Sequence, residues 1–148
     1  MVDFNTIDET ITVCGQLSES DMNHVAARGF RLLINNRPDG EVDDQPTSEE
    51  VASWAARHGI EYHYLPVASR QMALHDVAAF GGIYGPAQGP TLAFCRSGMR
   101  SAILWALTMA TVGGLEREEI VARANAAGYD ITSLRSALDG LIQVSPVA

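Results

Sequence analysis

The residues from Cys95 to Ser101 combine side chains that together stabilise negative charge beside a thiol. They read Cys-Arg-Ser-Gly-Met-Arg-Ser and lie between a short apolar run, residues 91–94, and a long apolar stretch. We therefore place them at a strand-to-helix junction, where a helix N-terminus offers unpaired N–H groups and partial positive charge. Gly98 lets successive N–H groups curl around the sulfur. A thiol needs such surroundings to ionise, so we expect Cys95 to act as a thiolate nucleophile.

The other residues of this loop have separate expected roles. Arg100, in the first turn of the helix, can clamp an oxyanion with two donors, and Ser101 can donate a hydrogen bond to the sulfur. The remaining residues contribute the anion-binding backbone: Arg96, Ser97, Gly98 and Met99. Most cysteines are small buried hydrophobes, which is the competing interpretation of Cys95. A predicted strand is followed here by Cys, Gly, Arg and Ser in this order, which favours the catalytic interpretation.

Strands and helices alternate along the chain around this loop. Four runs are β-branched, alternating or almost continuously apolar and are therefore predicted strands: residues 10–14, 30–35, 60–65 and 91–94. With helices between them, this order predicts an α/β fold with a central parallel four-stranded sheet flanked by helices.

The predicted helices have their own sequence signals. Ser18 or Ser20 can cap the first helix, and Thr47 with Glu50 forms a capping box for the second. Two more helices are expected at about residues 74–84 and 100–112, and two amphipathic helices close the chain, the last one capped by Asp130. The helix at 100–112 is apolar on nearly every side, which predicts a central position.

Three loops should meet at one edge of the sheet, because ligands bind at the carboxyl ends of parallel strands. These loops are residues 36–45, 66–72 and 95–100. We find no repeat and no linker that would divide the chain, so residues 1–148 are expected to form a single domain. Within it, about residues 4–112 would be the catalytic core and residues 113–148 a helical C-terminal tail.

Composition and charge narrow the class of partner. The chain has 148 residues, 47% of them hydrophobic and 19% charged, which fits one soluble domain with a real core. Its net charge of −8 argues against nucleic acid and anionic membranes as partners. All ten cationic side chains are arginines, so an anion site must use guanidinium and backbone N–H groups.

Cysteine and histidine usage predicts a reducing setting and no metal. Two cysteines make no disulfide framework and the N-terminus lacks a signal pattern, so we expect a cytoplasmic protein. Cys14 is expected in the core of a strand, although it could also lie close enough to Cys95 to resolve a persulfide or protect it as a disulfide. The four histidines have no metal-ligand spacing, and we expect neither a metal nor a cofactor.

The spacing within the loop resembles two known active sites. Four residues separate Cys95 from Arg100, which resembles the active loop of rhodanese-type sulfurtransferases. The loop is also similar to that of cysteine-dependent protein phosphatases, which separate the two by five residues and usually carry His before Cys. Phe94 stands at that place here. On the loop alone, the chain is closer to the sulfurtransferases.

Further segments resemble one bacterial family. They are Gly15-Gln16-Leu17, the run from Asn35 to Glu41, Tyr64-Leu65-Pro66-Val67, and the run from Cys95 to Trp105. Together they resemble the phosphatase-like domain of beta-lactamase hydrolase-like proteins, also labelled a sulfurtransferase family, over about residues 4–110. The resemblance implies a tyrosine-phosphatase-like fold carrying a rhodanese-length loop. In relatives this domain can be fused to a metallo-hydrolase domain of the persulfide-oxidising type, and residues 1–148 are expected not to include such a domain.

Two arginines and one aspartate outside the loop are further candidates for the site. Arg37 and Asp39 lie in the run Arg-Pro-Asp-Gly-Glu, which by sequence chemistry is a solvated turn. The resemblance and the expected place of this run at the edge of the sheet make Arg37 a candidate substrate contact, and the expected place alone makes Asp39 a candidate general acid. Arg70 is a second candidate substrate contact.

The sequence leaves sulfur transfer, phosphate hydrolysis and simple binding open. Sulfur transfer from thiosulfate or a related donor would form a Cys95 persulfide, release sulfite without a general acid, and pass sulfur to a thiol such as glutathione. Hydrolysis of a phosphorylated substrate needs an acid for the leaving group, and residues 66–72 contain no carboxylate. We therefore predict a rhodanese-like sulfurtransferase, with a cysteine-dependent phosphatase as the alternative. A non-catalytic module that binds an anion or a phosphorylated partner ranks third.

Overall fold

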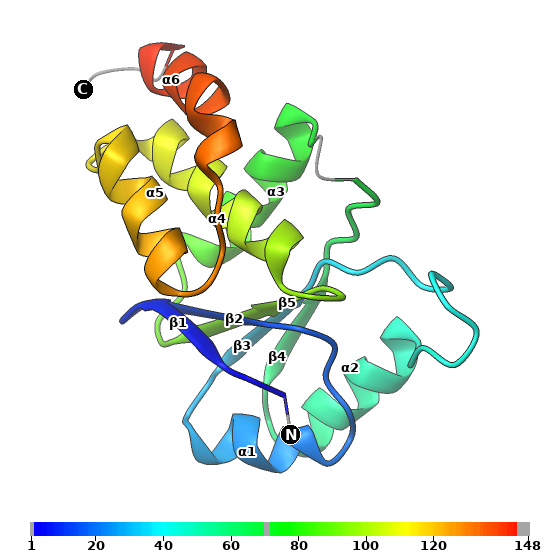
Figure 1. Cartoon of the computed structure of the whole chain (residues 1–148). Helices are drawn as coiled ribbons and strands as arrows, with labels where there is room; N and C mark the ends of the chain where they lie inside the picture. Colours follow the sequence, from blue (N-terminus) through cyan, green and yellow to red (C-terminus); the bar gives the residue numbers. More distant parts are fainter. Residues whose placement is uncertain (1, 70–71, 145–148) are drawn as a thin grey trace.

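A five-stranded mixed sheet forms the centre of the computed structural model, which describes residues 2–69 and 72–144 (Figure 1). In chain order its strands are β1 (Asn5–Asp8), β2 (Ile11–Cys14), β3 (Leu32–Asn35), β4 (Glu61–Tyr64) and β5 (Thr91–Phe94). They are arranged across the sheet in the order β1-β2-β5-β3-β4. The pairs β2–β5, β5–β3 and β3–β4 are parallel, as the alternation of strands and helices predicts.

The prediction of four parallel strands is wrong at one edge, where β1 pairs antiparallel with β2. β1 is missing from the prediction because Ile7 is its one buried residue, so it lacks an apolar run. The turn to β2 is held by the carboxylate of Asp8, which accepts the N–H groups of Thr10 at 2.8 Å and Ile11 at 3.2 Å. This strand is therefore specified by its turn and its neighbour rather than by its own hydrophobic pattern.

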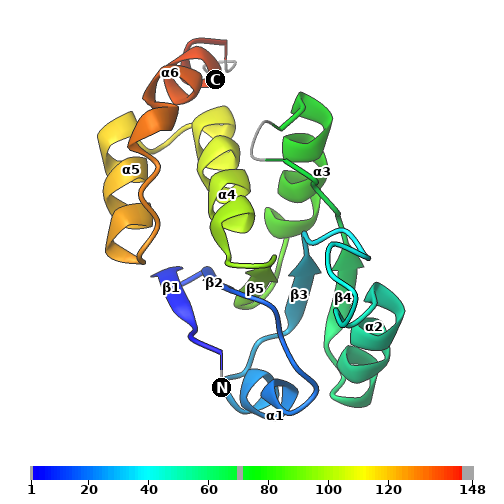
Figure 2. The same cartoon turned by 45° about the vertical axis from the view of Figure 1, so that its right-hand side comes forward.

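Helices cover both faces of the sheet (Figures 1 and 2). In chain order they are α1 (Asp21–Ala27), α2 (Ser48–Arg57), α3 (Leu74–Tyr84), α4 (Met99–Val112), α5 (Arg117–Ala126), the 3₁₀ turn η1 (Thr132–Leu134) and α6 (Arg135–Val144). α1 and α2 lie on one face, and α3 to α6 on the other. The last expected helix thus begins with a 3₁₀ turn, where Asp130 accepts the N–H of Thr132 at 3.0 Å.

Alternate residues of the central strands face the two cores. In β3, Leu33 belongs to the cluster under α1 and α2, whereas Leu32 and Ile34 belong to the cluster that contains α4. Both faces are covered, which explains the continuous apolar run in the sequence. α4 is the central helix of the larger cluster, as its apolar character predicts, and it contacts α3, α5 and α6.

The predicted capping box at the start of α2 is present. The hydroxyl of Thr47 accepts the N–H of Glu50 at 3.1 Å, and the carboxylate of Glu50 accepts the N–H of Thr47 at 3.1 Å. Such a cap is worth about 1 kcal/mol. The capping box fixes the N-terminal end of α2, which follows the loop after β3.

The carboxyl ends of β2, β3 and β5 meet at one edge of the sheet, where the site is expected. Cys14 and Asn35 both lie in register with Phe94, so the loops that follow them are neighbours of the loop after β5. The N–H of Asn36 donates to the carbonyl of Phe94 at 2.8 Å, and the N–H of Val67 donates to the carbonyl of Asn36 at 3.0 Å. The three predicted loops therefore come together.

Candidate active site

Cys95 lies directly after β5, at the entrance to α4, and is 1% exposed. Its sulfur accepts the backbone N–H of Gly98 at 3.1 Å. Gly98 adopts a φ of 98°, a left-handed conformation that turns the chain back over the sulfur before α4 begins. A cysteine with N–H donors at a helix N-terminus is a recognised setting for a nucleophilic thiolate.

The loop after β2 supports residues 95–100, which we call the anion-binding loop, from the side. The N–H of Gln16 donates to the carbonyl of Arg96 at 3.2 Å. A Cβ atom on Gly15 would lie only 2.9 Å from that same carbonyl oxygen, so glycine is needed for this close approach. The anion-binding loop is thus fixed by backbone contacts with a neighbouring strand end.

Arg100 is held by two acceptors from two different loops. Its Nη1 donates to Glu41 Oε2 at 2.7 Å and to the carbonyl of Val67 at 2.8 Å, and its Nη2 donates to Glu41 Oε1 at 2.9 Å. These hydrogen bonds from Arg100 are the main cause that lowers the pKa of Glu41 to about 2. Glu41 in turn raises the pKa of Arg100, with a smaller contribution from Cys95. The guanidinium is therefore a fixed cation beside Cys95.

Arg37 contacts Glu41 and Gln16. Its Nε donates to Glu41 Oε1 at 2.9 Å, its Nη1 donates to Gln16 Oε1 at 3.0 Å, and its side chain is buried. In this conformation Arg37 supports Glu41, and through it Arg100. Its predicted role as a substrate contact has no direct geometric support here.

Ser101 is fully buried and donates to Asn36 Oδ1 at 2.8 Å. We expected this hydroxyl to donate to the Cys95 sulfur. The structure uses its single proton for the amide oxygen of Asn36, whose Nδ2 donates to the carbonyl of Leu65 at 2.9 Å. Ser101 therefore connects the start of α4 with the loops after β3 and β4.

Asp39 is exposed, and its contacts fasten the loop after β3 to α2. Its Oδ1 accepts the N–H of Ser48 at 2.7 Å, and its own N–H donates to the hydroxyl of Tyr64 at 2.8 Å. The carboxylate of Asp39 thus lies at the N-terminus of α2. Arg70, the other candidate contact, lies outside the described residues.

A pocket opens over the anion-binding loop. Its lining comes from three loops and the first residues of α4: Glu41, Ala68, Arg96, Ser97, Met99 and Arg100. Arg96 is exposed at its rim, where it can attract anions by long-range electrostatics. The hydroxyl of Ser97 accepts the N–H of Met99 at 3.3 Å and so shapes the last turn before the helix. An anionic group in this pocket would meet two arginines and the loop N–H groups.

Cys14 is a buried free thiol at the end of β2. Burial is the main cause that raises the pKa of this thiol, with Asp21 and Cys95 adding to the effect. Cys14 is therefore protonated at neutral pH. Cys95 is also a free thiol in this structure, so a redox connection between the two stays a prediction.

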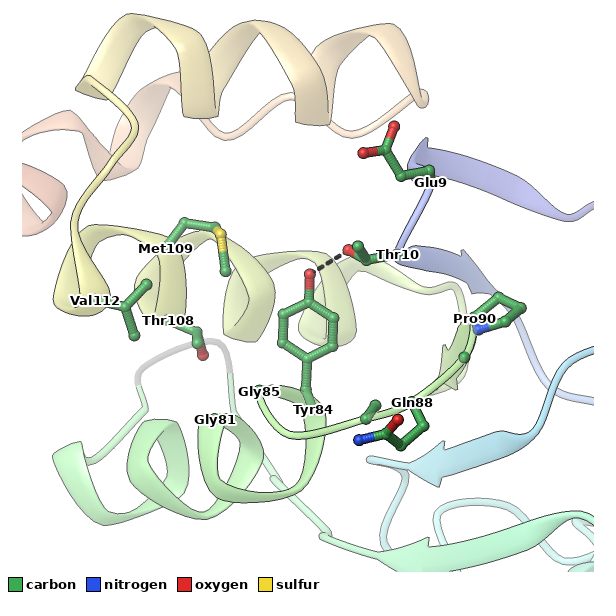
Figure 3. Close-up of a pocket in the computed structure, with 12 residues that line it drawn as sticks. Glu9, Thr10, Gly81, Tyr84, Gly85, Gln88, Pro90, Thr108, Met109 and Val112 are labelled. Atoms are coloured by element: carbon green, nitrogen blue, oxygen red, sulfur yellow. Dashed lines mark hydrogen bonds between the residues drawn. The ribbon is translucent and has the colours of Figure 1, made fainter.

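A second pocket lies at the opposite edge, near the amino ends of β2 and β5 (Figure 3). Tyr84 stands in it, and its hydroxyl is 2.5 Å from that of Thr10. None of the residues that line this pocket is a cysteine, histidine or arginine. The candidate catalytic residues that the sequence predicts therefore lie at the other edge, where the parallel strands have their carboxyl ends.

Sequence reasoning did not assign roles to three residues of the site: Gln16, Glu41 and Tyr129. Glu41 follows Arg37 by four positions, and this spacing could have indicated an ion pair between the two side chains. Tyr129 lies in the tail and carried no signal at all; its hydroxyl donates to the carbonyl of Ser97 at 3.3 Å.

In the described residues we find no group of three histidine, cysteine or carboxylate side chains that could hold a metal ion. Within the same part of the chain, no helix combines the length and apolar character needed to cross a membrane.

Comparison with known proteins gives the chain a family context. A family model described as the phosphatase-like domain of beta-lactamase hydrolase-like proteins matches residues 3–112. A beta-lactamase hydrolase-like protein from Xylella fastidiosa (strain Temecula1) is 34% identical over 125 residues, which cover 84% of this chain and 29% of that protein. The chain thus spans less than a third of the length of the curated relatives it matches.

Solved structures share the fold. A proposed phosphatase from Neisseria meningitidis Z2491 is 35% identical, with a TM-score of 0.82 over 92% of this chain and 96% of that one. PTPMT1 in complex with PI(5)P is 18% identical, with a TM-score of 0.73 over 95% of this chain and 94% of that one. At the latter identity the likeness concerns the fold alone. The expected tyrosine-phosphatase-like fold is confirmed, with a mixed five-stranded sheet among the described residues.

Proposed function

The chain belongs to the family of the phosphatase-like domain of beta-lactamase hydrolase-like proteins, and from this premise we propose that it is a cysteine-dependent phosphatase. The observation that carries the proposal is the geometry at the entrance to α4. There the Gly98 N–H contacts the Cys95 sulfur, and Arg100 is held beside it by Glu41. These groups can bind the oxygens of a phosphoryl group while the sulfur attacks its phosphorus.

The proposed reaction has two displacement steps. The Cys95 thiolate attacks the phosphorus of a phosphate monoester, so a sulfur–phosphorus bond forms and the phosphorus–oxygen bond to the leaving group breaks. The leaving alkoxide or phenoxide takes up a proton. Water then attacks the phosphocysteine, the sulfur–phosphorus bond breaks, and inorganic phosphate and the thiolate are released. The loop N–H groups and Arg100 bind the non-bridging oxygens in both steps.

We keep Asp39 as the candidate acid for the leaving group. Its loop follows β3 and reaches the edge of the sheet that carries Cys95, and residues 66–72 offer no carboxylate. We expect Asp39→Asn to slow alkyl phosphates, whose leaving groups need a proton, about 100-fold, and aryl phosphates with acidic phenols severalfold at most. The measurement is kcat for a series of leaving groups. Equal slowing of the whole series, with a lower Tm, would assign Asp39 only the structural contact with Ser48.

Sulfur transfer is our second candidate because of one feature of the loop. The four-residue spacing between Cys95 and Arg100 is the length of a rhodanese loop, and a sulfite leaving group needs no acid. The family match and the neighbouring structures favour the phosphatase. Sulfane donors and thiol acceptors such as glutathione therefore take second place to phosphorylated substrates.

The experiment that tests the proposal compares the native protein with Cys95→Ser on both chemistries. We expect the native protein to release phosphate from p-nitrophenyl phosphate, and Cys95→Ser to lose at least about 10⁴-fold of that rate. In parallel, intact mass is measured after mixing the reduced protein with thiosulfate. One added sulfur on the native protein only, lost again to cyanide, without phosphate release, would overturn the phosphatase in favour of the sulfurtransferase.

A further inference from the structure

Tyr129 reaches the anion-binding loop from the C-terminal part of the chain, beyond the residues that the family model matches. α5 ends at Ala126, and Gly128 takes a left-handed φ of 101° that turns the chain back. The N–H of Tyr129 then donates to the carbonyl of Ala124 at 2.9 Å. Its side chain, 5% exposed, enters the core cluster around α4. A glycine-terminated helix thus delivers an aromatic side chain to the loop.

The Tyr129 hydroxyl is part of a short chain of hydrogen bonds. It accepts the Nδ2 of Asn5, from β1, at 2.9 Å and donates to the carbonyl of Ser97 at 3.3 Å. Burial is the main cause that raises the pKa of Tyr129, so the phenol keeps its proton at neutral pH. The ring also lies against Gly98: a Cβ atom there would collide with the hydroxyl and lie 2.9 Å from Cζ.

The Ser97 carbonyl and the Gly98 N–H belong to the same peptide unit, and this makes the contact important. In a trans peptide the carbonyl and the N–H point in opposite directions, and no described peptide bond is cis. Tyr129 holds the carbonyl on one side, while the N–H on the other side donates to the Cys95 sulfur at 3.1 Å. Rotation of this unit would turn the N–H away from the sulfur. Glycine tolerates φ of either sign, so Gly98 itself offers little resistance to that rotation.

We propose that Tyr129 is a positioning residue of the anion-binding loop, which holds the Ser97 carbonyl and so keeps the Gly98 N–H aimed at Cys95 and at an oxyanion bound there. The kinetic part of this inference rests on the proposed phosphatase function. Its anion-binding part does not, because any oxyanion in the loop would use the same N–H group.

The test removes only the hydroxyl, with Tyr129→Phe. We expect the dissociation constant of inorganic phosphate to rise about fivefold and kcat/KM for p-nitrophenyl phosphate to fall about fivefold to twentyfold, mainly through kcat. The matched control is Tyr84→Phe. Tyr84 is also a buried tyrosine, 8% exposed, with its hydroxyl bonded to Thr10 at the opposite edge (Figure 3). This control should leave both quantities within twofold of the native values.

A second variant protects the test against a loss of folding. Asn5→Ala leaves the ring and the hydroxyl of Tyr129 in place and removes the donor that orients that hydroxyl. We expect a twofold to threefold weakening of phosphate binding in the same direction. Native phosphate affinity in both Tyr129→Phe and Asn5→Ala would overturn the inference. Equal losses in Tyr129→Phe and Tyr84→Phe would overturn it too, because they would reflect a general effect of a buried hydroxyl.

The two proposals fail in different ways. If the native protein releases no phosphate but Tyr129→Phe weakens phosphate binding, the phosphatase proposal fails and the positioning role stands. If the native protein turns over and both Tyr129→Phe and Asn5→Ala match it in phosphate binding and rate, the positioning role fails and the phosphatase proposal stands.

Discussion

Two carboxylates in this molecule each accept hydrogen bonds from two arginines, and their surroundings differ. Glu41 binds Arg37 and Arg100 at the edge of the site, whereas Glu118 binds Arg117 and Arg135 on the helical tail. The distances are alike, 2.7–2.9 Å for Glu41 and 2.8–3.1 Å for Glu118. The side chain of Glu41 is 23% exposed and that of Glu118 is 57% exposed.

This difference in exposure decides what each cluster can do. Around Glu118, water competes with every contact, and exposed ion pairs of this kind contribute little to stability. Around Glu41, Arg37 is buried and Arg100 also donates to a backbone carbonyl. These contacts hold the three side chains in one fixed arrangement. Contacts of similar length therefore hold the guanidinium of Arg100 in one place around Glu41, whereas around Glu118 they lie on the exposed surface.

The largest expected effect comes from replacing the arginine of each cluster by lysine. Arg100→Lys should lower kcat/KM for p-nitrophenyl phosphate about 10³-fold, because an ammonium cannot contact Glu41 with two donors and still face the phosphoryl oxygens. The matched control, Arg135→Lys, should leave kcat/KM unchanged. Steady-state kinetics of both variants checks this. A loss below tenfold for Arg100→Lys would show that fixed geometry is not what distinguishes the Glu41 cluster.

A smaller effect is expected when the carboxylates become amides. Glu41→Gln should lower kcat/KM about 10-fold to 100-fold by loosening Arg100, and lower the free energy of unfolding by about 1–2 kcal/mol after allowing for solvent screening. Glu118→Gln should leave kcat/KM unchanged. Urea unfolding and kinetics of the two variants measure the contrast. Similar results for both would break the comparison between the clusters.

The smallest expected effect is a pH dependence that sharpens the comparison. Contacts with Arg100 lower the pKa of Glu41 from 4.5 to about 2, so Glu41 contributes stability that is fully present above pH 4.5 and is lost as pH falls through 2. The difference in unfolding free energy between the native protein and Glu41→Gln should therefore shrink by more than half from pH 6 to pH 3. Urea unfolding at both pH values checks it. A difference that grows on acidification would contradict the assigned sign.

Much of the fold follows from local sequence patterns that specify a strand, a helix or a cap without contacts from distant residues. The apolar runs of β3 and β5, the capping box of α2 and the limits of α3 were all predictable, because each depends on residues close together in the chain. β1 was not, because its pairing depends on β2 and on the turn at Asp8. A short half-exposed strand carries too little pattern to identify itself.

The same division runs through the site. Cys95, Gly98 and Arg100 were recognisable together because a single loop and the start of one helix bring them together. The partners of that loop come from far along the chain: Glu41 lies 59 residues from Arg100, and Tyr129 lies 32 residues from Ser97. The expected meeting of residues 36–45 with residues 95–100 brings Glu41 near the loop but does not identify Arg100 as its partner, and nothing in the local pattern around Tyr129 indicates its contact with the loop. Ser101 is the reverse case, since its position was predictable but its acceptor, Asn36, was not.

The sequence by itself determined that Cys95, Gly98 and Arg100 lie together in one strand-to-helix loop, and it determined the alternation of strands and helices, because these depend on residue types at short spacing. Only the tertiary structure decided the mixed sheet, the partner that holds Arg100 and the hydroxyl that holds the Ser97 carbonyl. The physical reason is that a hydrogen bond between distant segments depends on how the helices pack, and packing is a property of the whole core.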